Sequence, residues 1–144
     1  MGSEMCIRDR EITDNPKNKE VLKVIPKPTH MQRGLATILI EVPHKFTIDV
    51  MELIDIARKA VSAPTYELLK KEDEAKLIIN ALNKPRFTED VVRHMARGVI
   101  EKFSKLPAET RIYLEYRSFE SIHSHDLIAK LRTTLGALIE EIDN

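Results

Sequence analysis

The apolar and polar positions of the chain follow two periods, one typical of strands and one typical of helices. Residues 35–42 are rich in β-branched side chains and lie between Gly34 and Pro43, which predicts a buried strand. Residues 111–117 alternate apolar and polar side chains, which predicts a second strand with one exposed face. The sequence therefore predicts two strands, separated by about seventy residues of a different pattern.

Between and beyond these strands, apolar side chains recur every three or four residues, which predicts helices. The predicted helices cover residues 15–22, a stretch from a cap at Thr47 or Asp49 to Val61, residues 77–82, a stretch from a cap at Thr88 to Phe103, and residues 127–142. Residues 65–69 are expected to add a helical turn or two, and residues 70–74 to form a polar junction. The order of strand, helices, strand and helix indicates an α+β fold with antiparallel pairing.

Size and composition are those of a globular domain. The 144 residues are enough for one domain or for one part of a larger protein, with 42% apolar and 32% charged side chains. Lys and Arg (23) balance Asp and Glu (23), so no attraction to nucleic acid or to an anionic membrane surface is expected. No apolar run has the length of a transmembrane helix, and no signal-peptide core is present.

The first residues have neither period. Residues 1–10 are interpreted as a foreign leader, and the leader or a disordered segment is expected to extend to residue 14. The folded domain is accordingly expected at residues 15–144. The single cysteine, Cys6, excludes an internal disulfide, which favours a reducing, cytoplasmic setting.

The densest chemistry lies in residues 117–126, directly after the second predicted strand. Glu120 and Asp126 supply carboxylates there, and His123 and His125 are two of the five histidines of the chain. Imidazole and carboxylate groups together can bind a divalent metal ion or transfer protons near neutral pH. A strand end is a rigid support for such groups, so this segment is the first candidate for a functional site.

Four motifs, taken in order along the chain, resemble the signatures of one enzyme family. They are His-Met-Gln-Arg-Gly at residues 30–34, Ser-Ala-Pro-Thr-Tyr-Glu-Leu-Leu-Lys at 62–70 with Glu-Asp-Glu at 72–74, Phe-Thr-Glu-Asp-Val-Val-Arg at 87–93, and Phe-Glu-Ser-Ile-His-Ser-His at 119–125. Together they resemble the type IB GTP cyclohydrolases, and within them the archaeal MptA-like branch of methanopterin biosynthesis. The resemblance extends from residue 27 to the C-terminus. Any one motif is weak evidence, whereas four in order are specific.

This resemblance implies a tunnelling fold (T-fold), in which each module is an antiparallel sheet with helices packed on one face. The family carries two such modules in one chain, so 144 residues are expected to form the C-terminal one. Subunits of the family join their sheets into barrels, which implies a homo-oligomer formed through sheet edges. The implied substrate is GTP: water attacks C8 of guanine, formate leaves, and the ribose carbons close a dihydropterin ring. The implied product in this branch is 7,8-dihydroneopterin 2′,3′-cyclic phosphate.

The resemblance also implies roles for individual residues. The implied metal is Fe²⁺, with Zn²⁺ or Mn²⁺ as alternatives, and a metal ion can make water nucleophilic at neutral pH. The implied roles are metal ligation by His30 and Glu74, metal binding or proton transfer by Glu120 and His123, recognition of the guanine edge by Glu89, contact with the triphosphate by Arg33, and orientation of a neighbouring group by His125.

Each role has a simpler alternative. His30 and Arg33 can be solvated residues beside a strand, and Glu74 lies in a charged run of the kind that usually faces solvent. Glu89, in the first turn of a predicted helix, can stabilise the helix dipole without binding any ligand. His94 is interpreted as an ordinary surface residue.

The chain departs from the family pattern at one important position. The family carries a metal-binding Cys-Pro-Cys upstream of the first motif, whereas this chain has only Cys6, between Met5 and Ile7. A second hypothesis is therefore an inert T-fold oligomerisation module that lacks the metal-binding thiolate. A third, another purine- or pterin-handling enzyme of the same fold, is disfavoured because the four motifs match this branch in order.

Overall fold

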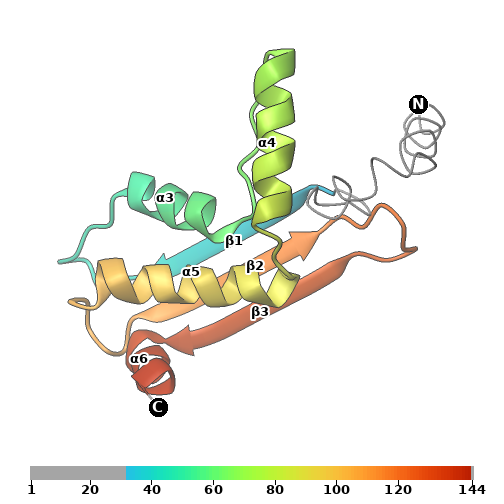
Figure 1. Ribbon diagram of the computed structural model, residues 1–144. Helices are drawn as coiled ribbons and strands as arrows, with labels where there is room; N and C mark the ends of the chain where they lie inside the picture. The colour runs from blue at the N-terminus through green and yellow to red at the C-terminus, as the bar shows by residue number, and fades with distance from the viewer. Residues whose placement is uncertain (1–31, 144) are drawn as a thin grey trace, which may run out of the picture.

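The computed structural model describes residues 32–143, and the side chains of residues 32–141. Along the chain the elements are β1 (Gly34–Glu41), α3 (Val50–Ala60), α4 (Lys71–Asn83), α5 (Thr88–Phe103), β2 (Arg111–Ser118), β3 (Leu127–Thr134) and α6 (Leu135–Asp143) (Figure 1). The predicted helix at residues 15–22 and the predicted leader lie outside the described residues. Among the described helices, none is long and apolar enough to cross a membrane.

The three strands form one antiparallel sheet in the order β1-β2-β3. β2 is central, and its Ser118 lies opposite Gly34 of β1 on one side and Leu127 of β3 on the other. Both predicted strands, at residues 35–42 and 111–117, are confirmed to within one residue at each end. The sheet is open, so β1 and β3 are both edge strands in the described part of the chain.

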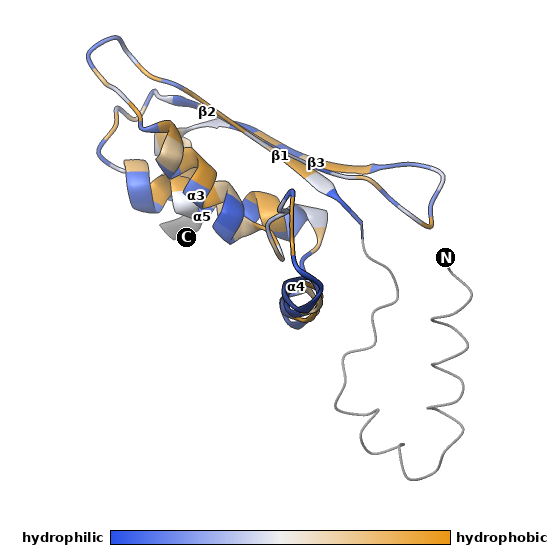
Figure 2. Cartoon of the chain, turned by 90° about the horizontal axis from the view of Figure 1, so that it is seen from above, coloured by the Kyte–Doolittle hydropathy of each residue, from blue (hydrophilic) through white to orange (hydrophobic). Residues whose placement is uncertain are grey.

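Helices cover one face of this sheet, as Figure 2 shows from above. α5 packs against β2, β3 and α3, while α3 packs against β1 and α6 against α5 and β3. The predicted α+β class, with an antiparallel sheet and helices packed on one face, is confirmed, and the arrangement is consistent with a T-fold module. The opposite face of the sheet leaves large apolar side chains exposed, among them Leu35 (56%), Leu39 (57%) and Ile128 (54%).

The core lies between α5 and the helix-facing side of the sheet. α5 places one apolar face inward, as its three-to-four-residue repeat predicts. Asp90 accepts a hydrogen bond from the backbone N–H of Phe87 at 3.3 Å, which satisfies one free donor at the start of this helix. The buried apolar residues are Ile56, Ala60, Val91, Val92, Met95, Ala96, Val99, Phe103, Ile112, Leu114, Leu135 and Leu138.

Helix α4 stands apart from this core and projects away from the sheet (Figure 1). None of its residues is buried. The segment after it is anchored to the end of α3, because Lys84 Nζ donates hydrogen bonds to the carbonyl oxygens of Lys59 and Val61 at 3.0 and 3.1 Å. Arg86 donates to the carbonyl oxygens of Lys59 and Ala60. Two cations thus satisfy the free carbonyls at the negative end of α3.

The helix predicted at residues 127–142 is wrong over its first half, because residues 127–134 form β3. The leucines at 127, 131 and 135 fit a helical period, yet Ala129 and Leu131 also alternate with the exposed Ile128 and Lys130 as a strand requires. Pairing decides the outcome: β2 offers a second edge, and β3 pairs with it over all eight residues. Only residues 135–143 are helical.

Three smaller expectations are also wrong. Residues 65–69 form no helical turn, and residues 71–74, expected to be a polar junction, are the first turn of α4. The acidic residues of that turn favour a helix start because they lie at the positive end of the helix dipole. Thr88 is the first buried residue of α5 rather than its cap, which is Phe87.

Candidate functional site

The candidate site lies at the end of the sheet where β1 begins, β2 ends and β3 begins. Residues 119–126 form the loop that joins β2 to β3 at this end. Figure 1 shows α5 also beginning at this end of the sheet. The structure therefore places two motifs side by side: the described part of the first (residues 32–34) and the fourth (residues 119–125). More than eighty residues separate them in sequence.

Gln32 joins these two motifs through its side-chain amide. Nε2 of Gln32 donates to Oε1 of Glu120 at 2.6 Å and to Oγ of Ser118 at 2.9 Å. The backbone N–H of Phe119 donates to the carbonyl oxygen of Arg33 at 2.9 Å, which continues the β1–β2 pairing beyond Gly34. Ser118 is buried, whereas Glu120 is only half-buried. The carboxylate of Glu120 is thus held from the sheet while it stays accessible from outside.

An ion pair closes the base of the loop. Nε and Nη2 of Arg117 donate to Oδ2 of Asp126 at 2.9 and 2.7 Å, and the guanidinium lies 5.4 Å from the ring centre of Phe119. The two side chains of the pair are 46% and 30% exposed, so solvent limits its contribution to stability to about 1 kcal/mol or less. Its structural effect is to hold the two ends of the loop together.

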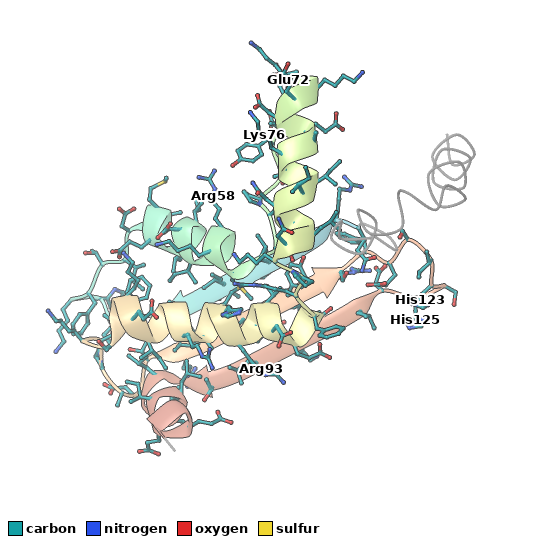
Figure 3. All side chains as sticks on the ribbon, in the orientation of Figure 1. Arg58, Glu72, Lys76, Arg93, His123 and His125 are labelled. Carbon is teal, nitrogen blue, oxygen red and sulfur yellow. The ribbon has the colours of Figure 1, made fainter. Side chains whose placement is uncertain are left out.

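His123 and His125 stack on each other in this loop. Their ring centres are 5.8 Å apart with an interplanar angle of 28°, and both side chains are exposed. Figure 3 shows both imidazoles on the loop, away from α4. Among the described residues, none forms a hydrogen bond with either ring. His125 therefore contacts His123 by stacking, and both rings are open to a ligand or another chain.

Tyr116 packs against the first residue of β1. A Cβ atom added to Gly34 would overlap the hydroxyl oxygen and Cζ of Tyr116. The ring is half-buried, and burial raises the pKa of its hydroxyl. Gly34 therefore leaves space for an aromatic ring between the first motif and the sheet.

Gly34→Ala is expected to destabilise the fold by about 1–3 kcal/mol, because the ring of Tyr116 must move to make room. Urea unfolding of the purified chain measures this free energy. In a Tyr116→Ala background the same substitution is expected to cost less, since the overlapping atoms are gone. An equal cost in both backgrounds would show that the overlap is not the cause.

The other residues implied by the resemblance lie at different places. Arg33 is exposed beside the Gln32–Glu120 contact, and Glu89 is exposed in the first turn of α5, which begins at the same end of the sheet. Glu74 lies on α4, between Glu72 and Lys76. Figure 3 labels these two neighbours on the projecting helix, far from the imidazoles of His123 and His125. His30 lies outside the described residues.

Glu74 instead lies close to residues 65–69 of its own motif. Together with Leu77 and Ile78 of α4 and residues 65–69, it lines an open hollow of about 510 Å³. Tyr66 and Leu68 of this segment are 57% and 92% exposed. Within the described part of the chain, Glu74 lies beside residues 65–69 and Gln32 contacts Glu120, but the structure does not bring these two places together.

The described residues do not form a metal site by themselves. In residues 32–141, no group of three or more His, Cys, Asp or Glu side chains lies close enough to hold an ion. Glu120, His123 and His125 have the oxygen and nitrogen donors that Fe²⁺ or Zn²⁺ accepts, but they do not converge on one point. The donor chemistry of the loop suits such an ion, whereas its geometry in this single chain does not.

His94 lies in a separate groove between α3 and α5, near positively charged side chains. His94 was expected to be an ordinary surface residue, yet it is half-buried. Burial lowers the pKa of its imidazole, and the positive charges of Arg86, Arg97 and Lys84 lower it further, while Asp90 acts in the opposite direction. The imidazole is thus favoured in its neutral form.

Stability is therefore expected to fall as the pH falls below 6.5, the usual pKa of histidine. As the pH falls, His94 takes up a proton at a higher pH in the unfolded chain than in the folded chain, so protonation favours unfolding. Well above pH 6.5 the imidazole is neutral in both states and this effect vanishes. Urea unfolding at a series of pH values measures it. His94→Asn should flatten this part of the profile, whereas the exposed His44→Asn should not.

Reasoning from the sequence missed Gln32, Ser118 and Tyr116 as site residues. A signal for Ser118 was present, because the alternation of β2 points residues 112, 114, 116 and 118 to the same face. A serine at an inward position of a strand requires a hydrogen-bond partner. Gln32 lies inside the first motif, but nothing in the sequence shows which side chain its amide reaches.

Comparisons with known proteins give one consistent answer. The family described as type I GTP cyclohydrolase folE2 matches residues 4–129. The chain is 39% identical to a protein of Methanocaldococcus jannaschii named GTP cyclohydrolase MptA, over 96% of this chain and 45% of that protein. A protein of the same name from Methanosphaera stadtmanae is 40% identical over 91% of this chain and 42% of its own length. The chain thus spans less than half the length of these relatives.

Proposed function

The chain belongs to the type I GTP cyclohydrolase family described as folE2, and from this membership we propose that it forms part of an enzyme that hydrolyses the guanine ring of GTP. The proposed products are formate and a 7,8-dihydroneopterin phosphate, with the 2′,3′-cyclic phosphate as the form expected in methanopterin or folate-type pterin biosynthesis. Within the family, we assign it to the type IB, MptA-like branch and to the C-terminal T-fold module. The four motifs and the MptA-named relatives support this assignment.

The observation that supports the proposal most is the contact between Gln32 and Glu120. Members of an active site must converge although they are distant in sequence, and these residues lie 88 positions apart. The hydrogen bond between them, 2.6 Å long, joins the first and fourth motifs, which the resemblance requires to serve one site. The antiparallel pairing of β1 with β2 brings the two motifs to the same end of the sheet, and this hydrogen bond joins one side chain of each motif.

The residues of the loop are proposed to move the protons of ring opening. Hydrolysis of an aromatic ring requires a group that takes a proton from water and a group that protonates a departing nitrogen. Glu120 is a carboxylate accessible from outside, and His123 is an exposed imidazole on the same loop, so both types of group are present. His125, stacked on His123, is proposed to restrict the orientation of that ring.

Substrate recognition is proposed to involve charges at the same end of the sheet. Glu89 is exposed in the first turn of α5, where a carboxylate can accept both N–H groups of the guanine edge. Arg33 is exposed beside the Gln32–Glu120 contact, where its guanidinium can pair with a phosphate. Both assignments depend on GTP binding at this end.

The proposed enzyme depends on a divalent metal ion, Fe²⁺ or alternatively Zn²⁺ or Mn²⁺. Such an ion would supply the Lewis acidity that makes water nucleophilic at neutral pH. The proposed ligands are His30 and Glu74. His30 lies outside the described residues, and Glu74 lies on the projecting helix α4. Because the described residues of one chain form no complete donor set, the proposal requires ligands from elsewhere, either beyond residues 32–141 or from another subunit.

A homo-oligomer formed through sheet edges is the proposed assembly. β1 and β3 are both open edges in the described part of the chain, and the sheet face away from the helices exposes Leu35, Leu39 and Ile128. Open edges with apolar neighbours favour pairing with another strand. A cytoplasmic location is proposed because the single cysteine suits a reducing compartment.

An anaerobic assay with GTP and Fe²⁺ tests the proposal directly. The purified chain is expected to release formate and a product that becomes a fluorescent pterin after oxidation, whereas GTP without protein gives neither. Metal titration tests the ligand assignment, since His30→Ala should weaken Fe²⁺ or Zn²⁺ binding and His44→Ala should not. Absence of pterin from a chain that is folded and binds GTP would favour the alternative of an inert T-fold oligomerisation module.

A further inference from the structure

We infer that Gln32 is a positioning residue that fixes the carboxylate of Glu120 for its role in the reaction. This inference rests on the proposed function, and it adds a role that neither the resemblance nor the comparisons assign. It starts from the geometry of one amide group. Nε2 of Gln32 lies 2.6 Å from a carboxylate oxygen and 2.9 Å from a hydroxyl oxygen, so this one nitrogen has two acceptors.

The chemistry of the partners sets the orientation of the amide. An ionised carboxylate can only accept hydrogen bonds, so the nitrogen of Gln32 and not its oxygen must face Glu120. The amide nitrogen carries two protons, and it has two acceptors, so each proton has one partner. One proton goes to the charged Oε1 of Glu120, and the other goes to Oγ of Ser118.

Ser118 makes this arrangement rigid. It is only 5% exposed, it is the last residue of the central strand, and it pairs directly with Gly34 of β1. The next residue, Phe119, donates its N–H to the carbonyl of Arg33. The backbone of residues 33–34 and of residues 118–119 is therefore fixed by strand pairing, and the buried hydroxyl of Ser118 fixes the amide itself.

The consequence for Glu120 is that one of its oxygens is held, while the other has no hydrogen bond within the described part of the chain. Oε1 accepts the amide proton, while Oε2 accepts no hydrogen bond from a described residue. A glutamate side chain without partners samples several rotamers, and ordering it costs conformational entropy. Because the bond to Gln32 already orders Glu120 in the folded chain, this cost does not arise again during the reaction. Gln32 thus presents Oε2 in a defined direction without touching the reacting atoms.

The amide can be observed without any enzyme activity, because Gln32 is the single glutamine of the chain. Labelling the glutamine side-chain nitrogen with ¹⁵N therefore gives one NH₂ pair in the NMR spectrum of the full chain. Hydrogen bonding is expected to slow exchange of these protons with water by about tenfold relative to free glutamine. Because the two amide protons have different acceptors, removal of one acceptor should change the exchange rate of one proton only.

Three alanine variants test this assignment, and alanine keeps Gln32 the only glutamine. Glu120→Ala is expected to restore fast exchange to one amide proton, and Ser118→Ala to the other. Glu41→Ala, at the opposite end of β1 and paired with Arg111, is the matched control and should change neither. Unchanged exchange in Glu120→Ala would overturn the inference, whatever the activity of the chain.

The kinetic test separates positioning from a merely structural role. Gln32→Met keeps the length of the side chain and removes both hydrogen bonds. It is expected to lower kcat by about 10- to 100-fold with KM changed less than about twofold, as is typical when a partner that orients an active-site group is lost. In a Glu120→Ala background it should have no further effect. A loss of equal size in that background would overturn the inference.

The two failures are distinguishable. If the chain forms no pterin from GTP, the proposed function fails for this chain, and the amide exchange still decides whether Gln32 holds Glu120. If pterin forms but Gln32→Met leaves kcat unchanged, the proposed function stands and the positioning role is wrong. Circular dichroism and urea unfolding of each variant show that the fold is intact in either case.

Discussion

Glu120→Gln is expected to lower the rate of pterin formation from GTP by about 10²- to 10⁴-fold, the range typical of a residue that transfers a proton. The substitution keeps the size of the side chain, so the half-buried site and the loop should remain folded. It removes the negative charge and the ability to take up a proton, which are the two properties that the proposed reaction needs. The measurement is kcat from the fluorescence of the oxidised product.

The matched control for this prediction is Glu41→Gln. Glu41 is the last residue of β1, at the far end of the same sheet, and its carboxylate forms a surface pair with Arg111 at 3.4 Å. Surface pairs of this kind contribute little, so the activity is expected to stay within about twofold of the wild type. If both variants lose activity equally, the loss reflects the sheet as a whole and not a reaction at Glu120.

Much of the fold could be predicted because local periods and tertiary packing agree. In α5 the apolar repeat predicts one buried face, and Val91, Met95 and Val99 are indeed among its buried residues. In residues 127–134 the two levels disagree, since the leucine spacing fits a helix while the sheet needs a third strand. The sequence does not show that β2 has a free edge, so the competing strand could not be predicted from its own residues.

The candidate site was predictable at the level of segments but not of contacts. The fourth motif was identified from its own chemistry, and its proximity to residues 32–34 follows from antiparallel pairing of β1 with β2. That Gln32 would be the contacting residue depends on side-chain geometry that only the folded sheet defines. The position of Glu74 depends on the direction in which α4 leaves the core, which no period in the sequence encodes.

Leu114→Ala is expected to be the most destabilising of the substitutions considered, at about 3–5 kcal/mol. Leu114 is fully buried in the central strand, between Ile38 of β1 and Leu131 of β3 and beneath α5. Truncation removes buried apolar surface and leaves a cavity that close-packed neighbours cannot fill. Because the free energy of unfolding of a small domain is only about 5–15 kcal/mol, the urea concentration at the midpoint of unfolding should fall markedly.

Leu39→Ala is the control that turns this prediction into a test of the exposed sheet face. Leu39 lies on β1 opposite Tyr113, on the side away from the helices, and is 57% exposed. If only the helix-covered face is buried in solution, truncation of Leu39 should change the free energy of unfolding by about 0.5 kcal/mol or less. A cost close to that of Leu114→Ala, growing with protein concentration, would instead mean that another chain covers this face. The same pair of variants therefore measures the core and tests the proposed oligomer.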